Sequence, residues 1–488
     1  MKTRTITRLT VVLLGILCAT SLGQWVDVAP ALSYRDYTLE GPIRVFVTRA
    51  DRSKDNWVFD TMIAQGSVIN GRETVPDMVK RYDDSVNFEG TRYDIKAAIN
   101  GSYFNMRTGY PSAGQIISGW FALRFGEYSG STGFIWTFDR DFILCGNVRN
   151  DREYQRIVFA DKAKMSINEI NKARGENELV VYTQHYAAST GTSGDGVEVL
   201  VQLDGPMCIQ PRGDQNIGTI VEIRRDKGST LLPFDHVVLS ASGKAAKELL
   251  ARAHKGEKLR IELGNKDFGN KAVKLAPHDW RGAYAGITGH CYCLVDGVVH
   301  SEHWESKARK KIAAGGKSGA VVQDPRSVLA ANDEYLYFVV ADGRSAASKG
   351  FTFTQAGEFC RDKLKATNAI LQDGGGSSIM WVNGEVKNVP SDGQPRAVAN
   401  GFCFALTHKP EISNRFTTGS RVACKRDDVC RLGPGTQYGE AGRAAKRQAG
   451  VVLEHKLNGI KAKGTYWWLC RFGEVQGWLS ENDLTGGR

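Results

Sequence analysis

The chain has 488 residues, of which 42% are hydrophobic and 24% are charged, a balance typical of a globular protein with room for one large domain and one small domain. Its ten cysteines are far too few for a scaffold built from disulfides. The net charge of +11 favours contact with an anionic polymer, although a merely solvated surface explains it as well. Outside the cell that polymer is a phosphate-rich wall polysaccharide, and we expect no nucleic acid.

The amino terminus has the pattern of a secretory signal peptide. Basic residues precede a short apolar run at 9–19, which is too short for a stable membrane anchor. We predict a signal peptide at 1–31, cleaved near Gly23 or Ala31, and a protein that is secreted, periplasmic or associated with the cell wall. Loss of Cys18 leaves nine cysteines, an odd number that requires a free thiol or an intermolecular bond. No later segment is long and apolar enough to span a membrane.

Short apolar and β-branched runs recur along the next part of the chain. Residues 44–48 and 94–99 have the composition of strands. Residues 242–254 carry apolar side chains at helical spacing, and 258–263 alternate like a strand. The chain therefore predicts a mixture of strands and a few helices.

The most regular unit lies between residues 336 and 371. A buried strand at 336–341 precedes a helix that starts at a capping box, Thr352 with Gln355, and a second strand follows at 369–371. If the two strands are parallel neighbours, Asp342 and Asp373 emerge side by side at their carboxyl ends, where open sheets of this kind place their chemistry.

The second strand runs directly into the sequence DGGGSS at 373–378. Consecutive glycines allow positive φ and let a ligand approach main-chain N–H groups, and the two serines add hydroxyl donors. This combination suits phosphate oxygens. A plain turn between strands is the alternative.

The carboxyl-terminal part has a different composition and pattern. Residues 408–420 are polar and lack periodicity, as expected for a linker. Residues 421–488 are rich in predicted strands, and 421–485 resemble the bacterial SH3-like domain in the order of an Arg-x-Gly-Pro turn, a tryptophan strand and a terminal Gly-Trp pair. The resemblance implies a small barrel that binds a cell-wall component. We expect at least one of Trp467, Trp468 and Trp478 in its core, and Cys424 and Cys430 have the spacing for a local disulfide.

A series of sequence blocks in residues 94–406 is similar to the phosphodiester glycosidase family. In chain order they are AAINGSYFN at 97–105, VVLSASGKAAKELL at 237–250, DPRSVLA at 324–330, VVADGRS at 339–345 and DGGGSS with the segment up to Phe402. The resemblance implies cleavage of a sugar 1-phosphodiester. The segment ITGHCYCLVDG at 287–297 departs from the family pattern, which leaves the role of His290, Cys291 and Cys293 open.

This resemblance assigns roles to particular residues. Phosphate is already a good leaving group, so the reaction needs clamps on the phosphate and one carboxylate at the sugar, for which arginine forks and aspartates are suited. The catalytic candidates are Asp373 and Asp342, with a turn residue as the alternative for Asp342. The predicted substrate-binding residues are Asn100, Arg326, Arg344, Gly374, Gly375, Gly376, Ser377, Ser378, Arg396 and Asn400. A structural ion pair is the alternative for any one arginine, and a satisfied core amide is the alternative for Asn400.

The cluster of His290, Cys291, Cys293, His300 and His303 raises the question of a metal. Strand alternation sends the two cysteines to one face and His290 to the other, so buried or paired thiols are favoured over zinc ligands. We predict no metal site and no cofactor, and we leave a divalent cation open.

These expectations define one overall prediction. The fold class is α+β, with a mixed-sheet catalytic domain at 32–407, a linker at 408–420 and a small all-β SH3-like barrel at 421–488. The function is a secreted hydrolase that cleaves a sugar 1-phosphodiester of the N-acetylglucosamine-1-phosphodiester type to free sugar and phosphomonoester, on cell-wall or extracellular phosphoglycan. The alternatives are a non-catalytic protein that binds phosphoglycan in the wall, and a phosphodiesterase that cleaves at phosphorus.

Overall fold

The computed structural model describes residues 24–69, 71–112, 114–125, 132–150, 153–209, 215–314 and 320–486, with only the backbone for residues 301–305. The first 23 residues of the predicted signal peptide lie outside this range. Residues 26–29 form a strand paired with the next one, so cleavage near Ala31 would remove a paired strand, whereas cleavage near Gly23 would leave it in place.

The main domain contains an eight-stranded sheet, sheet A, in which every neighbouring pair is antiparallel. Its strand order is β1 (Val26–Ala29), β2 (Leu32–Leu39), β3 (Ile43–Asp51), β24 (Tyr335–Ala341), β23 (Arg326–Ala331), β25 (Asn368–Leu371), β21 (Tyr292–Val295) and β22 (Val298–Val299).

Two five-stranded sheets accompany sheet A. Sheet B has the order β27 (Glu385–Val386), β26 (Met380–Val382), β5 (Arg92–Asn100), β28 (Asn400–His408) and β4 (Trp57–Ile63). Sheet C has the order β7 (Trp120–Leu123), β6 (Gln115–Ile117), β20 (Ala283–Thr288), β8 (Gly133–Thr137) and β9 (Phe142–Cys145).

An aromatic core holds the three sheets together. Phe338 of sheet A stacks on Phe404 of sheet B with ring centroids 3.8 Å apart, and Phe59 of sheet B contacts Phe134 of sheet C at 5.5 Å. Each of these rings is fully buried. Because large aromatic side chains bury much apolar area, this cluster fixes how the sheets face one another.

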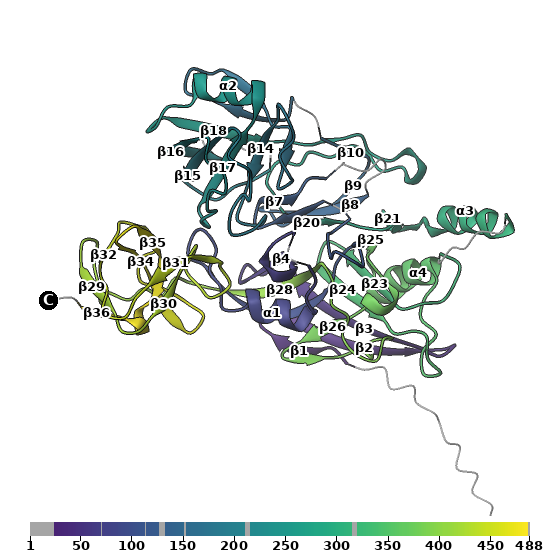
Figure 1. Ribbon diagram of the computed structural model, residues 1–488. Coiled ribbons are helices and arrows are strands. Elements are labelled where there is room, and N and C mark those ends of the chain that lie inside the picture. Colours follow the sequence, from purple (N-terminus) through teal and green to yellow (C-terminus); the bar gives the residue numbers. More distant parts are fainter. Residues whose placement is uncertain are drawn as a thin grey trace, which may run out of the picture.

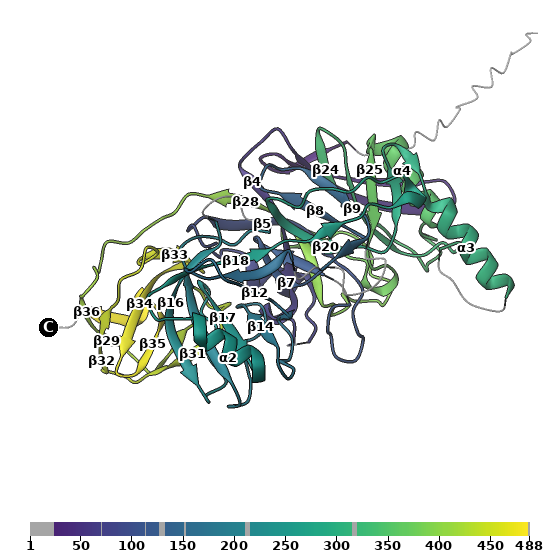
Figure 2. The same cartoon turned by 90° about the horizontal axis from the view of Figure 1, so that it is seen from above.

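The described residues contain few helices, and they lie at the periphery of the sheets. The four α-helices of the described residues are α1 (Val75–Tyr82), α2 (Gly243–Arg252), α3 (Ser301–Ala313) and α4 (Phe353–Leu364). Helix α4 starts at the predicted capping box and buries the predicted apolar face on sheet A, whereas α3 lies at the end of the molecule opposite the carboxyl-terminal module (Figures 1 and 2). Short 3₁₀ turns are η1 (Ala64–Gly66), η2 (Lys271–Val273), η3 (Gly375–Ser377) and η4 (Glu481–Asp483).

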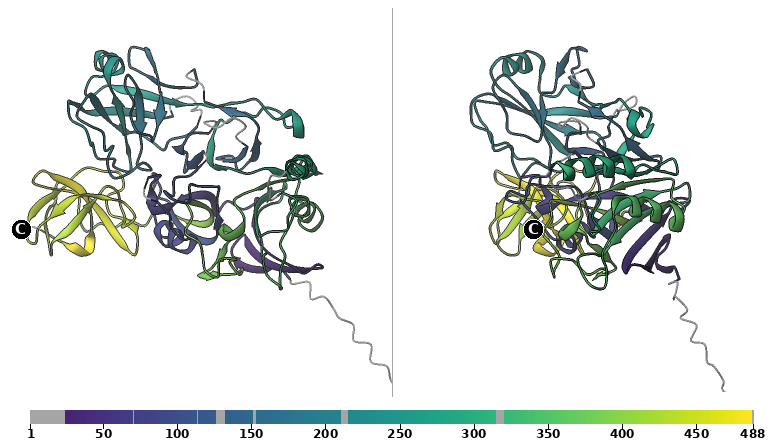
Figure 3. Two further views of the ribbon diagram at one scale, coloured as in Figure 1. Left: turned by 45° about the vertical axis from the view of Figure 1, so that its right-hand side comes forward. Right: turned by 90° about the vertical axis from the view of Figure 1, so that its right-hand side faces the viewer.

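A second body, the inserted domain, lies above the main domain in Figures 1 and 3. Its eight-stranded sheet carries α2 and has the order β12 (Lys164–Ser166), β11 (Gln155–Val158), β18 (Lys258–Leu263), β16 (Ile217–Arg225), β15 (Val197–Leu203), β17 (His236–Ala241), β14 (Leu179–Tyr182) and β13 (Glu169–Ile170). A two-stranded ribbon, β10 (Val148–Arg149) and β19 (Lys266–Asp267), stands beside it.

The carboxyl-terminal module, residues 421–486, is an eight-stranded antiparallel sheet. Its order is β31 (Glu440–Ala444), β30 (Asp428–Arg431), β35 (Val475–Ser480), β34 (Thr465–Phe472), β32 (Ala449–Val452), β29 (Arg421–Cys424) and β36 (Leu484–Gly486), with β33 (Ile460–Ala462) paired to β34. No ladder among the described residues closes this sheet into the barrel that the sequence predicted.

Four sequence predictions change at this level. The fold is mostly β with four short helices, which the α+β class still covers, but its sheets are almost entirely antiparallel: β13 and β14 form the only parallel pair among the ladders of the described residues. The predicted linker makes one core contact, since Phe416 is buried and contacts Trp468 at 5.3 Å, although most of the segment is exposed. Strands β24 and β25 run in the same direction, but β23 lies between them, so they are not neighbours.

The fourth change concerns the cysteines. All nine cysteines of the described residues are buried free thiols, including Cys424 and Cys430 of the predicted disulfide. Burial raises the pKa of eight of them, Cys145, Cys291, Cys293, Cys360, Cys403, Cys424, Cys430 and Cys470. Neutral thiols of this kind behave as small apolar side chains.

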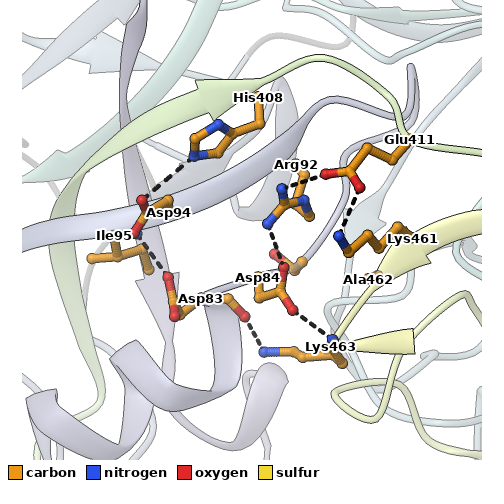
Figure 4. A network of polar contacts seen from close by, with 12 residues as sticks. Asp83, Asp84, Arg92, Asp94, Ile95, His408, Glu411, Lys461, Ala462 and Lys463 are labelled. Carbon is orange, nitrogen blue, oxygen red and sulfur yellow. Dashed lines mark hydrogen bonds and ion pairs between the residues drawn. The ribbon is translucent and has the colours of Figure 1, made fainter. Parts of the chain in front are cut away.

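The carboxyl-terminal module is docked on the rest of the protein through a polar network (Figure 4). The ammonium group of Lys463 donates to the backbone carbonyls of Asp83 and Lys80, and Gly464 N–H donates to the Asp84 carboxylate at 2.6 Å. Arg92 bridges Asp84 at 2.9 Å and Glu411 at 3.0 Å. Burial of the ammonium lowers the pKa of Lys463 to about 8.

An apolar contact completes this docking. Phe234 of the inserted domain is buried and meets Trp478 and Tyr438 of the module at ring distances of 5.8 and 5.7 Å. All three predicted tryptophans of the module, Trp467, Trp468 and Trp478, are buried. The module is therefore a packed part of the molecule rather than a freely tethered one.

We expect Phe234→Ala to destabilise the protein by about 3 kcal/mol, because it opens a cavity where the two bodies meet. Phe268→Ala is the matched control: Phe268 is 47% exposed, and its truncation should cost less than about 1 kcal/mol. Thermal unfolding of both variants checks the difference. Equal melting temperatures would show that this contact does not hold the module in place.

Candidate active site

The candidate active site lies at one edge of sheet A, and the strand directions explain why its residues meet there. Strands β24 and β25 end at this edge just before Asp342 and Asp373. The antiparallel strand between them begins at the same edge with Arg326, and β21 is preceded there by His290. The two aspartates thus share an edge, as predicted, with a basic residue on the strand between them.

The glycine turn allows three guanidinium groups to approach the backbone. A Cβ built on Gly374 would lie 3.4 Å from Arg326 Nη1, and one on Gly375 would lie 2.7 Å from Arg344 Nη2. A Cβ on Gly376 would collide with Arg396 Nη2 and with Asp392 Oδ1. Gly375 also has a positive φ of 61°. The fold therefore places the three predicted arginines directly against the three predicted glycines.

Ion pairs and hydrogen bonds hold the arginines in position. Arg344 forms two hydrogen bonds to the Asp324 carboxylate, at 2.7 and 3.0 Å, and Arg396 pairs with Asp392 at 2.7 Å. Arg326 is buried and donates to two backbone carbonyls, those of Phe351 and Val322. The bidentate pair orients the Arg344 guanidinium and balances part of its charge, whereas Arg326 is oriented by carbonyl oxygens alone.

Asp373 has the most strongly shifted carboxyl group of the candidate active site. Burial raises the pKa of Asp373 to about 6, against the opposing effects of the Ser377 hydroxyl, the Arg396 charge and the Gly374 N–H. Its backbone is fixed on both sides, since its carbonyl accepts from Asn100 Nδ2 at 2.7 Å and its N–H donates to Gly101 at 3.1 Å. Above pH 6 this group is a carboxylate in a confined position.

Asp342 has a different environment. It is 4% exposed, and one carboxylate oxygen accepts from Asn388 Nδ2 at 3.2 Å and Val389 N–H at 3.0 Å. Burial raises the pKa of Asp342 as well. The Asn388 amide also donates to the Ser378 carbonyl at 3.1 Å, so Asp342 supports the glycine turn through Asn388.

The two predicted asparagines lie beneath the turn and are fully buried. Asn100 accepts from Ser327 Oγ at 2.7 Å and from Ile379 N–H at 3.2 Å, besides holding Asp373. Asn400 is bonded to Ser102 and Gln115, which matches the core-amide alternative. Asn100 therefore holds the backbone of the turn from below, and Asn400 is bonded within the core beside it. The sequence interpretation placed both among the substrate-binding residues.

The two serines after the glycines differ in their partners. Ser377 Oγ accepts from Arg396 Nη1 at 3.3 Å. Ser378 is 1% exposed, and its hydroxyl has no hydrogen-bond partner among the described residues. A buried hydroxyl of this kind is free to bind a ligand oxygen.

The sequence interpretation missed an aromatic wall beside Asp373. Tyr103 packs edge-on against His290 at 5.1 Å, His290 packs against Phe353 at 5.3 Å, and the Arg326 guanidinium lies 4.8 Å from the Phe353 ring. Burial against these neighbours and the charge of Arg326 lower the pKa of His290 to about 4, so its imidazole is neutral at pH 7. The signals were present in the motifs INGSYFN and ITGHCYC, but only the fold brings them together.

The residues considered for a metal site do not come together in the described part of the chain. No group of three His, Cys, Asp or Glu side chains there is arranged to hold a metal ion. Cys291 and Cys293 point into the core while His290 is on the open side, as strand alternation predicted, and the side chain of His303 lies outside the described residues.

No helix in the described part of the chain is long and apolar enough to cross a membrane.

Comparisons with known proteins relate part of the chain to one family. The profile of the phosphodiester glycosidase family matches residues 213–405, which include Asp342, Asp373, the glycine turn and the three arginines. No curated protein matches the chain.

Solved structures resemble this chain at low sequence identity. A hypothetical protein from Synechocystis is 12% identical with a TM-score of 0.50, over 79% of this chain and 64% of its own length, so this chain spans less than two thirds of that protein. An exported protein from Burkholderia pseudomallei is 17% identical over 74% of both chains, with a TM-score of 0.48. The catalytic domain of zebrafish N-acetylglucosamine-1-phosphodiester alpha-N-acetylglucosaminidase is 14% identical, with a TM-score of 0.40, over 78% of this chain and 86% of its own.

We expect Gly376→Ala to disrupt the turn, because the new methyl group would occupy the place of the Arg396 guanidinium. Overpacking of this kind costs about 1 to 3 kcal/mol. Gly205→Ala is the control, since a Cβ there meets no atom within 4 Å. Melting temperatures check the prediction, and an unchanged value for Gly376→Ala would show that Arg396 moves aside freely.

Proposed function

We propose that residues 32–407 form a hydrolase that cleaves a sugar 1-phosphodiester, of the N-acetylglucosamine-1-phosphodiester type, to free sugar and phosphomonoester. The observation that carries this proposal is Asp373, a confined carboxylate beside a turn on which three arginines converge, within the segment that matches the phosphodiester glycosidase family. A carboxylate beside a cationic cradle matches the two ends of such a substrate.

The residues divide into two groups in this proposal. Arg396, Ser377 and Ser378 bind the phosphate and stabilise the charge that develops on the leaving oxygen, with Arg326 and Arg344 reinforcing the positive field. Asp373 acts at the anomeric carbon, as nucleophile or as base for water. The partly exposed ring of Tyr103 lies where it can pack on the sugar.

We further propose that the protein is exported and acts on cell-wall or extracellular phosphoglycan without a cofactor. The apolar run near the amino terminus and the net charge of +11 support this. In the same proposal the carboxyl-terminal module, residues 421–488, is an SH3-like unit that contacts a wall component.

Asp373→Asn should abolish turnover while preserving the fold, because it removes the charge but keeps the size of the side chain. Asp342→Asn is the paired variant: it keeps a hydrogen-bonding group towards Val389 and should remain active, with a loss of about tenfold or less. Initial rates on a synthetic N-acetylglucosamine-1-phosphodiester, together with melting temperatures, check both variants. Near wild-type turnover by Asp373→Asn would remove Asp373 from catalysis.

The products of the same reaction separate the proposal from its alternatives. Free reducing sugar with a phosphomonoester on the alcohol identifies cleavage at the glycosidic carbon. A sugar phosphate would indicate attack at phosphorus. Absence of any product would favour the alternative of a non-catalytic binding protein.

We expect the rate to rise with pH through about 6 and then to level off. The pKa of Asp373 is about 6, so below that value the carboxyl is protonated and inactive, and kcat/KM should fall about tenfold for each pH unit. His290 does not contribute to this limb because its pKa is about 4. A pH–rate profile of the wild-type protein measures the midpoint, and an acid limb near pH 4 would contradict the assignment.

A further inference from the structure

A second cavity, of about 390 Å³, lies away from the Asp373 edge, where the main domain, the inserted domain and the carboxyl-terminal module meet. The main domain contributes Asp60 and Tyr284, the inserted domain contributes His185, and the module contributes Gln437 and Tyr438. None of the residues assigned to the candidate active site lines this cavity. It is large enough for a small ligand of one or two rings.

The cavity has an aromatic wall and an open rim. The rings of Trp120, Phe88, Phe234, Tyr284 and Tyr438 line its interior. Exposed residues, Gln65, Ala188 and Thr436, lie at its margin, so a ligand can enter from solvent. Ring faces of this kind pack against the apolar face of another ring.

One buried polar atom in the cavity wall lacks a partner. His185 is 7% exposed, its ring packs edge-on against Trp120 at 6.2 Å, and its Nε2 makes no hydrogen bond in the described structure. Burial lowers the pKa of His185 to about 4, so the ring is uncharged at pH 7. An unsatisfied buried polar atom is costly, and a ligand group that pairs with it removes that cost.

The module supplies a second polar group. The Gln437 carboxamide lies beside the Tyr438 hydroxyl, but it has no hydrogen bond of good geometry at either its nitrogen or its oxygen. An amide offers both donors and an acceptor, so its ligand must both accept and donate. This requirement favours hydroxyl or amide groups over a simple cation or anion.

Most charged groups that line the cavity are already engaged by the protein, and Glu89 lies exposed at its rim. Arg81 pairs with Glu73 at 2.8 Å, and Arg431 donates to the Tyr438 carbonyl at 3.1 Å. The Asp60 carboxylate accepts from Ser118 N–H at 3.0 Å and Thr61 N–H at 2.8 Å, and also from the Ser118 hydroxyl. A neutral ligand therefore fits these walls better than an ion does.

We propose that this cavity binds a neutral sugar, one or two rings in size, with aromatic side chains against the ring faces and His185 and Gln437 hydrogen-bonded to its hydroxyl or acetamido groups. The site is separate from the proposed hydrolytic centre and does not depend on it. It is completed by the loop of the module that carries Gln437, so the docked module forms part of the binding site.

Binding of neutral sugars to the full-length chain tests this proposal. The probes are N-acetylglucosamine and its neutral disaccharide, with inorganic phosphate and tetramethylammonium as charged comparators, and the method is isothermal titration calorimetry. We expect saturable binding of a sugar and none of the comparators at this site. No sugar binding at about 10 mM would overturn the proposal. Ion binding that the cavity variants weaken would also overturn it, whereas phosphate bound at the candidate active site is expected to be unaffected by those variants.

Variants locate the binding. Gln437→Ala should weaken sugar binding about three- to tenfold, and His185→Phe, which preserves the ring but removes Nε2, should weaken it about tenfold or more. Gln476→Ala, at an exposed glutamine on β35 of the same module, is the matched control and should bind normally. If His185→Phe does not fold, Gln437→Ala and its control still decide the question.

The candidate active site provides the reciprocal control. Gly376→Ala should leave sugar binding in the cavity unchanged, whereas the two cavity variants should hydrolyse a small phosphodiester at the wild-type rate. Sugar binding lost in Gly376→Ala but retained in His185→Phe and Gln437→Ala would place the sugar at the Asp373 site and overturn the proposal. Failure of hydrolysis in the wild-type protein would not affect the binding result.

Discussion

The side chain of Asn100 ties two sheets together at the point where the glycine turn leaves sheet A. It ends β5 of sheet B, accepts a hydrogen bond from Ser327 in β23 of sheet A, and donates to the carbonyl of Asp373. Because Asn100 is fully buried, none of these hydrogen bonds competes with water. The backbone of Asp373, where the glycine turn begins, is held by this amide together with the hydrogen bond from its own N–H to the Gly101 carbonyl.

The strand pairing explains how one site can be built from distant segments. The residues of the turn are local in sequence, but Arg326 and Tyr103 arrive from other parts of the chain. Antiparallel pairing brings the start of β23 beside the end of β25, so Arg326 reaches the turn without a long loop. Tyr103 follows Asn100 by three residues and therefore reaches the same edge.

Much of the site was predictable from the sequence because its parts lie in compact motifs. Gly374, Gly375 and Gly376 were recognisable as a conformational requirement, and the matched motifs singled out the three arginines that lie against them. The strand order was not, because β23, β24 and β25 are all apolar and pattern alone does not give their pairing. The burial of Asn100 was also hidden, since an asparagine at the end of an apolar strand has the same pattern whether it faces a ligand or the core.

The carboxyl-terminal module shows a related limit. Its aromatic strands and its separate sheet were evident from composition, but the contacts that dock it, such as Lys463 on the backbone of Asp83, join residues 380 positions apart. The preceding segment is polar and mostly exposed, as its composition predicted, but one of its rings, Phe416, is buried against the module. Long-range packing of this kind leaves no local signal.

The burial of the thiols has a consequence for the folding of the chain. Once folded, the nine cysteines of the described residues are enclosed, and those with a raised pKa, such as Cys145, Cys403 and Cys470, carry little of the reactive thiolate form. Before folding, the same sulfurs are exposed and able to form disulfides with one another or mixed disulfides with small thiols. In an oxidising compartment the yield of active protein then depends on whether the core folds faster than its thiols are oxidised. Once the core has formed, the enclosed thiols are protected from oxidation.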